Sequence, residues 1–556
     1  MTPSGNAECL ERNGVSARPR SRIAYHTLLV VLALAILVRL PLLQFPMGTS
    51  AGTIAYVGQR WTEGAVPYRN AFDHRPPGLY LLSGFIVRRL APLGAAAEQG
   101  LLRLLGGRDA RLIRITQGEA MPETCRAVMW VIDLAAVALV YLLVRLWCGH
   151  WEAAVAAAIC AFFGGGFLVQ GDCLGAKHPV SLLSVVAMMA ALRSQGRRLA
   201  WLALGGLACG LAATFDYLAA FYALAIALWA ATDKGESDTA LRRWLLRPAV
   251  VLGATLVPMA AFAAWFWSQG AFTELWRCSV VYNVLYRWFP LAMRTPGLHW
   301  QTLRMLAPEQ GALWLFAGGW AIHAFSMGFS PQTRLVAFWG LAALAAALTV
   351  RQVQAEHFLQ TVPPLAIGAA LAVTNPSEPF LTRDARGRLE TRSLVLLLLV
   401  AGLALGFAYS EWRAWRAYAS RSELNEERAA AAVADMIRDR TTRGHPIYAW
   451  GVGPQVYVLA NRPAAHRIFY TRPLNVPWIV DEFFGGEGVF EEIYQTLARL
   501  EPAFFVTSEA ALPDDPLRQG PMRKWFAYLS EHYEPWRMDA TGPYIIYIRQ
   551  DRSRLP

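Results

Sequence analysis

Residues 46–80 read PMGTSAGTIAYVGQRWTEGAVPYRNAFDHRPPGLY, and the rest of the chain is interpreted outward from this stretch. It is polar, aromatic and rich in Gly and Pro, and it directly follows a long apolar run, so it begins at a membrane surface. Pro76 and Pro77 fix two φ angles and push Arg75 toward an extended conformation. Two interpretations stay open: Arg75 forks onto the phosphate oxygens of an anionic head group, or it pairs with Asp73 and pins the loop.

Composition predicts a polytopic α-helical membrane protein. Of 556 residues, 55% are hydrophobic and only 17% are charged, and the apolar residues form runs of bilayer-spanning length. The net charge of +12 lies largely in short loops, where the positive-inside rule expects it, so nucleic acid is excluded as a partner. The seven cysteines are scattered without a CxxC pair, so neither a metal site nor a disulfide framework is supported, and we expect no cofactor.

About eleven transmembrane helices are predicted within a module at residues 23–410, after a cytoplasmic tail at 1–22. If the spans alternate from that tail, the basic segments 193–198, 234–247, 333–334 and 383–392 all fall on the cytoplasmic side, as expected. The predicted spans lie at about 24–43, 126–147, 152–169, 179–194, 199–215, 217–231, 248–267, 312–328, 333–350, 358–373 and 393–409.

The remaining mass is expected on the extracytoplasmic face. Residues 44–124 form one large first loop, in which 78–93 reads as a helix lying along the membrane interface because Arg88 and Arg89 interrupt it. Residues 411–556 are predicted to form an α/β domain. It begins with a charged helix, and its strands are expected at 447–450, 456–459, 503–507 and 544–548.

Ionisable groups in or beside the spans are candidates for function because they are costly there. For Asp133, a hydrogen bond between helices is the favoured interpretation. Asp172 and Lys177 lie in the second outer loop, where a loop salt bridge and a cavity shared with the first loop remain equal alternatives.

Aromatic and polar residues follow at the same level of the membrane. Tyr282, Asn283 and Tyr286 could share one helical face, although aromatic and basic residues favour the interface in any case. His357, next to Glu356, opens the tenth span, where a lone histidine is more often structural than catalytic.

The pattern FPMG, AYVGQ and EGAVPYRNAFDHRPPGLYLL resembles the bacterial membrane glycosyltransferases of the GT-C superfamily. The nearest group is that of the protein O-mannosyltransferases (glycosyltransferase family 39) and the lipid A aminoarabinose transferase. The segments YNVLY, EHF and IYAWGVGPQVYVLANRPAAHRIFY occur in the same order. The resemblance implies transfer of a sugar from a polyprenyl-phosphate carrier to a glycan, lipid or protein acceptor, such as lipopolysaccharide, at the periplasmic face of the inner membrane.

The chain also departs from that family. The resemblance implies acidic residues where this sequence has Ser50 and Lys177, and a lysine where it has Asp216. The usual lysine before Pro-Pro is Arg75. A serine hydroxyl is too weak a base to replace a carboxylate. Either another residue acts as the general base, or this protein does not catalyse the transfer.

The resemblance and the residues together predict an inverting, metal-independent hexosyltransferase. Asp73 or Asp172 would deprotonate the acceptor, and Arg75 with Lys177 would hold the phosphate. The alternatives are a degenerate homologue that binds lipid-linked sugars without turnover, and a lipid-linked sugar transporter. The further residues expected at the substrate are His74, Tyr56, Tyr282, Asn283, Tyr286 and His357.

Overall fold

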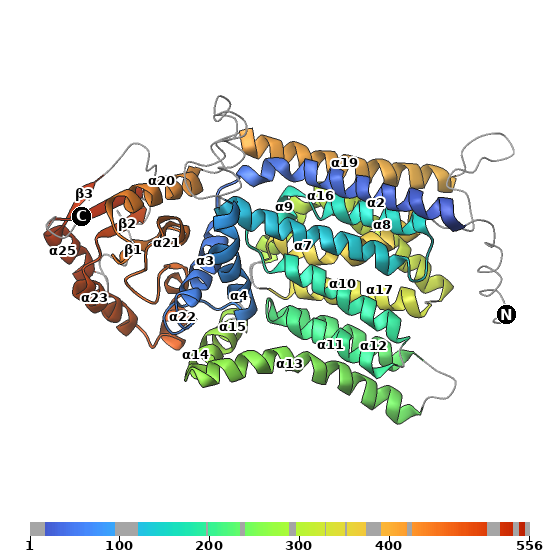
Figure 1. Ribbon diagram of the computed structural model, residues 1–556, viewed down its shortest axis with the longest axis horizontal. Coiled ribbons are helices and arrows are strands. Elements are labelled where there is room, and N and C mark those ends of the chain that lie inside the picture. Colours follow the sequence, from blue (N-terminus) through green and yellow to red (C-terminus); the bar gives the residue numbers. More distant parts are fainter. Residues whose placement is uncertain are drawn as a thin grey trace.

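A bundle of helices carries a small α/β domain at one end (Figure 1). The computed structural model describes residues 17–94, 121–195, 198–233, 239–288, 296–328, 330–350, 353–373, 391–419, 425–508, 523–536 and 544–550. The main bundle helices are α2 (Ala17–Arg39), α7 (Met121–Val144), α8 (His150–Phe163), α10 (Lys177–Ser194), α11 (Leu199–Ala213), α12 (Ala220–Thr232), α13 (Arg247–Ser268), α16 (Pro296–Met327), α17 (Pro331–Leu348), α18 (Val362–Val373) and α19 (Thr391–Ala419).

Each predicted span overlaps one of these helices. Among the described residues, two helices, Met121–Val144 and Arg242–Ser268, are long and apolar enough to cross a membrane by length and composition. The bundle also turns large apolar side chains outward, including Leu256, Leu315 and Phe325, which are 61%, 70% and 78% exposed. Water would not favour such a surface, whereas a hydrocarbon solvent would.

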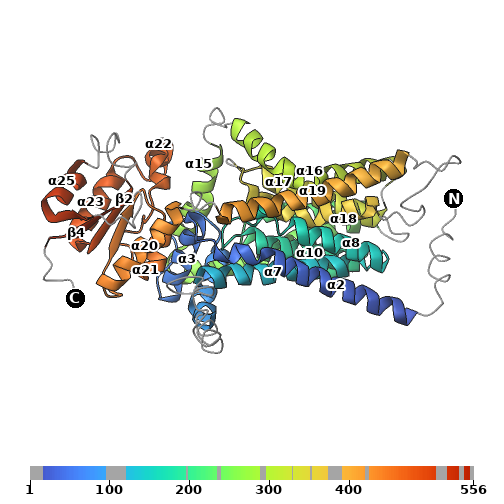
Figure 2. The same ribbon diagram turned by 90° about the horizontal axis from the view of Figure 1, so that it is seen from above.

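The first loop forms a layer between the bundle and the C-terminal domain (Figures 1 and 2). Its helices are α3 (Thr49–Thr62), α4 (Pro77–Phe85) and the π-helical η2 (Ile86–Leu90), which continues α4. A helix is therefore present at the residues where one was predicted, and Leu81 and Phe85 on it are exposed. Residues 95–120 of the predicted loop lie outside the described residues.

The C-terminal domain holds a four-stranded sheet in the order β1-β2-β4-β3. Strand β1 (Ile447–Trp450) pairs in parallel with β2 (Phe504–Ser508), and β4 (Tyr544–Arg549) pairs antiparallel with both β2 and β3 (Tyr533–Trp536). The domain's helices are α20 (Asn425–Arg440), α21 (Gln455–Ala460), α22 (Pro477–Glu482), α23 (Gly488–Leu500) and α25 (Arg523–His532).

The strand predictions at 447–450, 503–507 and 544–548 are confirmed, and the one at 456–459 is wrong. Residues 456–459 belong to helix α21, which begins directly after Pro454. A β-branched run there favoured a strand in the sequence, but proline is well suited to the start of a helix.

The first loop and the C-terminal domain share one hydrophobic core. The rings of Tyr56 and Phe469 lie 4.5 Å apart, and the Phe72 amide donates to the Arg467 carbonyl at 2.8 Å. Gln59 also donates to the Asn461 side chain at 2.6 Å. The domain is thus held directly over the loop that contains Asp73 and Arg75.

Candidate functional site

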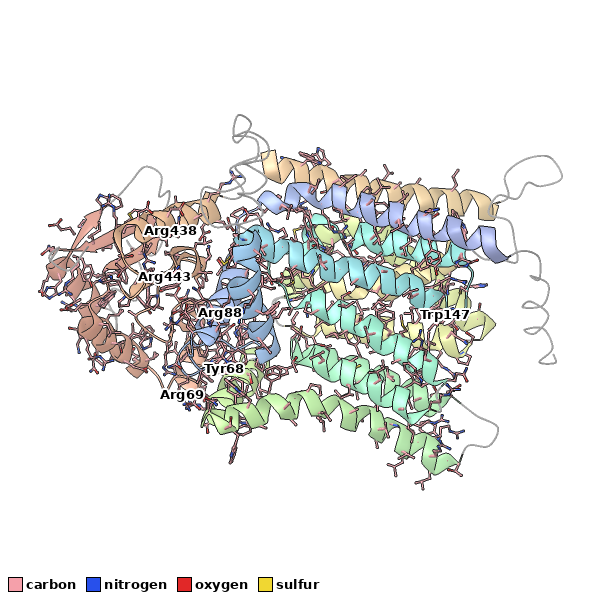
Figure 3. The ribbon with its side chains drawn as sticks, in the orientation of Figure 1. Tyr68, Arg69, Arg88, Trp147, Arg438 and Arg443 are labelled. Atoms are coloured by element: carbon pink, nitrogen blue, oxygen red, sulfur yellow. The ribbon has the colours of Figure 1, made fainter. Side chains whose placement is uncertain are left out.

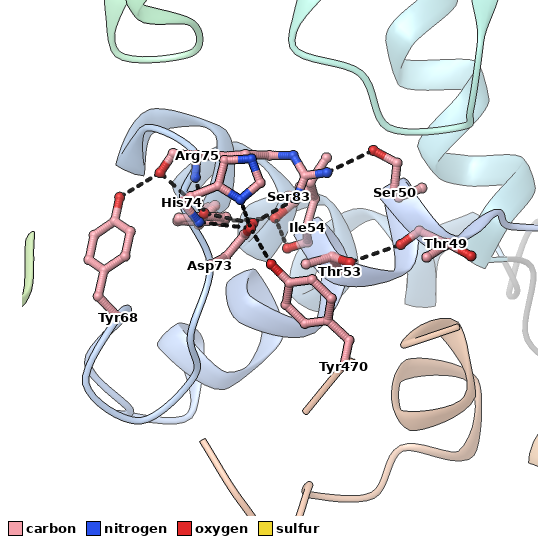
Figure 4. Close-up of polar contacts among 12 residues, drawn as sticks. Thr49, Ser50, Thr53, Ile54, Tyr68, Asp73, His74, Arg75, Ser83 and Tyr470 are labelled. Atoms are coloured by element: carbon pink, nitrogen blue, oxygen red, sulfur yellow. Dashed lines mark hydrogen bonds and ion pairs between the residues drawn. The ribbon is translucent and has the colours of Figure 1, made fainter. Parts of the chain in front are cut away.

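Asp73 is the centre of a closed hydrogen-bond network (Figure 4). Its side chain is 0% exposed, and Arg75 Nη1 and Tyr80 Oη each donate to Oδ2 at 2.8 Å. Oδ1 accepts from the His74 amide at 2.8 Å and from Tyr470 Oη of the C-terminal domain at 3.1 Å. Four donors therefore occupy both oxygens of this carboxylate.

These donors keep Asp73 ionised. Burial alone would raise its pKa, but the charge of Arg75 and the hydrogen bonds from His74 and Arg75 hold the pKa of Asp73 well below its usual range. The same ion pair raises the pKa of Arg75 although burial opposes it. The predicted pairing of Asp73 with Arg75 is present, and it leaves one face of the guanidinium for another partner.

That other face lies on a cavity of about 240 Å³, called here the central cavity. Arg75 Nη2 donates to Ser50 Oγ at 3.1 Å, and both residues line the cavity (Figure 4). Its walls come from α3, the residues after Asp73, and the second outer loop. Residues 215–217, the segment 282–286, Val350, residues 354–357, and residues 470–473 of the C-terminal domain complete them. Both interpretations of Arg75 are thus compatible, because it pairs with Asp73 and also faces a cavity.

Lys177 lines the central cavity, whereas Asp172 does not. Lys177 is 5% exposed and forms an ion pair with Asp216, which also lines the cavity. The alternative of a salt bridge between Asp172 and Lys177 is therefore wrong. Asp216 in addition accepts from the Leu218 amide at 3.0 Å.

Asp172 instead caps helix α3. Its Oδ1 accepts from the Gly48 amide at 2.9 Å and its Oδ2 from the Ala51 amide at 2.8 Å. The Cys173 amide also donates to Oδ1, at 2.7 Å. A carboxylate at a helix N-terminus satisfies otherwise unpaired amides. The Asp172 side chain therefore stabilises the start of α3, a helix that lines the central cavity.

The aromatic-polar segment predicted to share one face does so at the central cavity. Tyr282, Asn283 and Tyr286 all line it, and the two tyrosine rings are stacked with centroids 5.9 Å apart. The His74 ring stacks on Tyr282 at 5.0 Å, and Asn283 Nδ2 donates to the His74 carbonyl at 2.7 Å. This segment therefore holds the backbone next to Arg75 in place.

Two charged side chains of the central cavity were not among the sequence candidates: Glu356 and Arg472. His357, which was, lines the cavity beside them. Glu356 forms no hydrogen bond or ion pair with any described residue. Burial raises its pKa, the Asp172 charge adds to this, and Lys177 and Arg75 oppose it. The EHF segment is the sequence signal for this position, because it places Glu356 directly before His357.

Two remaining predictions concern residues away from the central cavity. Asp133 lies between helices, where it accepts from Gln170 Nε2 at 2.8 Å and contacts His178 Nδ1 at 2.9 Å, so the predicted interhelical hydrogen bond is confirmed. Tyr56 is 3% exposed and accepts from the Ala464 amide at 2.8 Å, so it joins the first loop to the C-terminal domain rather than lining this cavity. Among the described residues, no three His, Cys, Asp or Glu side chains are grouped as a metal site.

Comparison with known proteins finds likeness in structure. No protein-family model matches the chain, and no curated protein does. ArnT from Cupriavidus metallidurans in the apo state is 13% identical, with a TM-score of 0.56 over 94% of this chain and 98% of that one. The same protein bound to undecaprenyl phosphate is 14% identical, with a TM-score of 0.52 over 96% and 98% of the two chains.

An archaeal protein has the same architecture. The oligosaccharyltransferase AglB from Archaeoglobus fulgidus, in complex with an inhibitory peptide and a dolichol-phosphate, is 12% identical. Its TM-score is 0.51 over 97% of this chain and 75% of that one. ArnT and AglB are both GT-C superfamily proteins, so the predicted GT-C fold is confirmed.

Proposed function

We propose that this chain, a protein with the GT-C membrane fold, transfers a sugar from a polyprenyl-phosphate donor to an acceptor outside the cytoplasm. One observation carries the proposal: Arg75, Lys177 and Arg472 line the same cavity as Glu356, whose carboxylate forms no hydrogen bond or ion pair with another described residue. Cations and a carboxylate around one cavity suit a reaction in which a phosphate leaves and a hydroxyl is deprotonated. The structural neighbours bound to undecaprenyl phosphate and dolichol-phosphate support this class of donor.

Arg75 is the residue that we assign to the donor phosphate. Asp73 accepts a hydrogen bond from Nη1, so the guanidinium is oriented before any ligand arrives. Among the described residues, Nη2 donates to the neutral Ser50 hydroxyl. A phosphate oxygen can replace that hydroxyl with a stronger, charge-assisted hydrogen bond. Arg472 adds a second guanidinium to the same cavity, and Lys177 lies there in its ion pair with Asp216.

Glu356 is the residue that we assign as general base, in place of Asp73 and Asp172. Both oxygens of Asp73 are occupied and its pKa is lowered, so it is a poor proton acceptor. Asp172 is used in capping α3. Glu356 forms no hydrogen bond or ion pair with another described residue, and its raised pKa makes it a better base.

The proposed step balances as a direct displacement. The acceptor hydroxyl gives its proton to the Glu356 carboxylate while its oxygen attacks the anomeric carbon. The bond from that carbon to the phosphate oxygen breaks, and its electron pair stays on the phosphate, which Arg75 stabilises as charge develops. A single displacement inverts the anomeric centre, and the proposed reaction uses no metal.

The position of the cavity supports a site at the outer edge of an inner membrane. The cavity lies where the bundle meets the first loop and the C-terminal domain. Helices α10, α13 and α17 run from there to the far end of the bundle (Figure 1). Arg193 is in the last turn of α10, Arg243 is just before α13 and Arg334 is in the first turn of α17, so all three lie at that far end. Basic residues concentrate on the cytoplasmic side. We therefore assign the C-terminal domain to the periplasm.

The test is release of polyprenyl phosphate from a polyprenyl-phosphate hexose by the purified full chain, with membrane extract as acceptor. Glu356→Gln is expected to lower turnover by roughly 10²–10⁴-fold and to leave donor binding within a factor of two or so. Glu487→Gln, a matched change at an exposed residue that does not line the cavity, should leave turnover unchanged. If Glu356→Gln turned over at the wild-type rate, the assignment of Glu356 as general base would be wrong.

The second candidate is a protein that binds lipid-linked sugars without turnover. Asp73 and Asp172 are both committed to structural hydrogen bonds, and Ser50 faces Arg75 where the resemblance implies an acid. Donor binding that depends on Arg75, with no release of polyprenyl phosphate from any membrane extract, would favour this binder.

A further inference from the structure

A second pocket lies where the first loop meets the C-terminal domain, apart from the central cavity. It has a volume of about 830 Å³ and is lined by residues of α3, of η2 with the residues after it, of the start of α7, and of the C-terminal domain. Among the described residues, four arginines line it together with one acid, Glu63. We call it the arginine pocket, after Arg60, Arg88, Arg443 and Arg462.

The four arginines differ in how many of their N–H donors are already used in hydrogen bonds and ion pairs. Arg462 is 6% exposed, and its guanidinium donates to Thr441, Ala460, Asn461 and Arg438, so it builds the wall. Arg60 pairs with Glu63.

Arg88 and Arg443 are the available cations. Arg88 uses one nitrogen on the Thr62 carbonyl and is exposed. Arg443 is exposed and forms no hydrogen bond or ion pair within the described part of the chain. Figure 3 shows Arg88 on the first loop and Arg443 on the C-terminal domain, on either side of their junction.

One side of the pocket is apolar, and exposed apolar side chains lie on the helical segment beside it. Val87, Ala91, Pro92 and Met121 give it an apolar side. The same helical segment exposes Leu81, Phe85 and Leu93 by 55%, 54% and 64%. An apolar stretch beside arginines suits a ligand that is a lipid with an anionic head group.

We propose that the arginine pocket binds the phosphate of an anionic phospholipid head group, with Arg88 and Arg443 as its ligands. Each guanidinium presents paired N–H donors to phosphate oxygens. The apolar side of the pocket receives the first carbons of the lipid. The bound lipid joins the first loop to the C-terminal domain at the bilayer surface, and this role is independent of the proposed transfer reaction.

The test measures lipid binding to the full chain in detergent by native mass spectrometry, with phosphatidylglycerol, phosphatidylcholine and inorganic phosphate as probes. Wild type should bind phosphatidylglycerol in preference to the other two. Arg88→Gln with Arg443→Gln should weaken that binding by roughly 30-fold, since each arginine near an anionic head group contributes on the order of 1 kcal/mol. Arg443→Gln alone, at a position with no described partner to lose, should weaken it by roughly fivefold while the chain stays folded.

The matched control is Arg89→Gln with Arg499→Gln, which removes the same charge from two exposed arginines that do not line the pocket. These variants should bind phosphatidylglycerol as wild type does. If the control pair lost phosphatidylglycerol binding equally, the effect would come from the overall positive charge of the surface, and the proposal would be overturned. Binding of inorganic phosphate as tightly as the lipid would overturn the lipid assignment.

Discussion

Tyr470 Oη of the C-terminal domain donates to Asp73 Oδ1 in the first loop at 3.1 Å, across 397 positions of sequence. Asp73 in turn holds Arg75 at the edge of the central cavity. Arg472, two residues after Tyr470, lines the cavity itself. The C-terminal domain is therefore a wall of the candidate site.

Tyr470→Phe is expected to weaken donor binding and leave the fold intact. The change removes one of four donors to Asp73, and a hydrogen bond to a charged group contributes about 1.5–3 kcal/mol. Because Arg75 is still held by Asp73, we expect the KM for the donor to rise roughly tenfold, with kcat changing less than twofold or so.

Tyr448→Phe is the matched control for that measurement. Tyr448 is also a buried tyrosine of the C-terminal domain, and its hydroxyl donates to the Ile468 carbonyl at 3.1 Å. It does not line the central cavity. If both variants raised the donor KM equally, Tyr470 would act only through the stability of the domain.

Activity should depend on pH through Glu356. As a general base Glu356 must be deprotonated, and burial with the nearby Asp172 raises its pKa above that of an ordinary glutamate, although Lys177, Arg75 and His178 oppose this. A raised pKa moves the acidic limb of kcat/KM to higher pH, so activity should fall as the pH drops through that value. Measured from pH 4 to 8 or so, the limb should be present in wild type and absent from the residual activity of Glu356→Gln.

The sequence predicts the bundle better than it predicts the site. The membrane spans can be predicted because few structures other than a transmembrane helix fit a long apolar run. The sequence does not predict strand β3, because Glu534 and Pro535 are unfavourable in a strand. Pro535 is tolerated there because β3 is an edge strand. The roles of Asp172 and Tyr470 depend on partners more than 100 positions away, which no local pattern reveals.

Ser50→Asp tests whether Arg75 is the donor's partner. Ser50 Oγ lies 3.1 Å from Arg75 Nη2, so a carboxylate at this position would pair with the guanidinium and compete with the donor phosphate. We expect donor affinity to fall by roughly tenfold, measured by competition with labelled polyprenyl phosphate. Ser50→Asn, of similar size but neutral, should reduce it far less. Higher turnover in Ser50→Asp would instead mean that a carboxylate here acts as a base.

Gly48→Ala tests the assignment of Asp172 to capping. A Cβ at Gly48 would lie 2.6 Å from Asp172 Oδ2, so the carboxylate must move away from the amides of Gly48 and Ala51. Loss of a helix N-cap costs about 1 kcal/mol, and we expect the Tm in detergent to fall on the order of 2 °C. Gly318→Ala, on a bundle helix with open space around the added methyl group, should not lower the Tm. If Gly48→Ala left the Tm unchanged but abolished turnover, Asp172 would act in the reaction rather than as a helix cap.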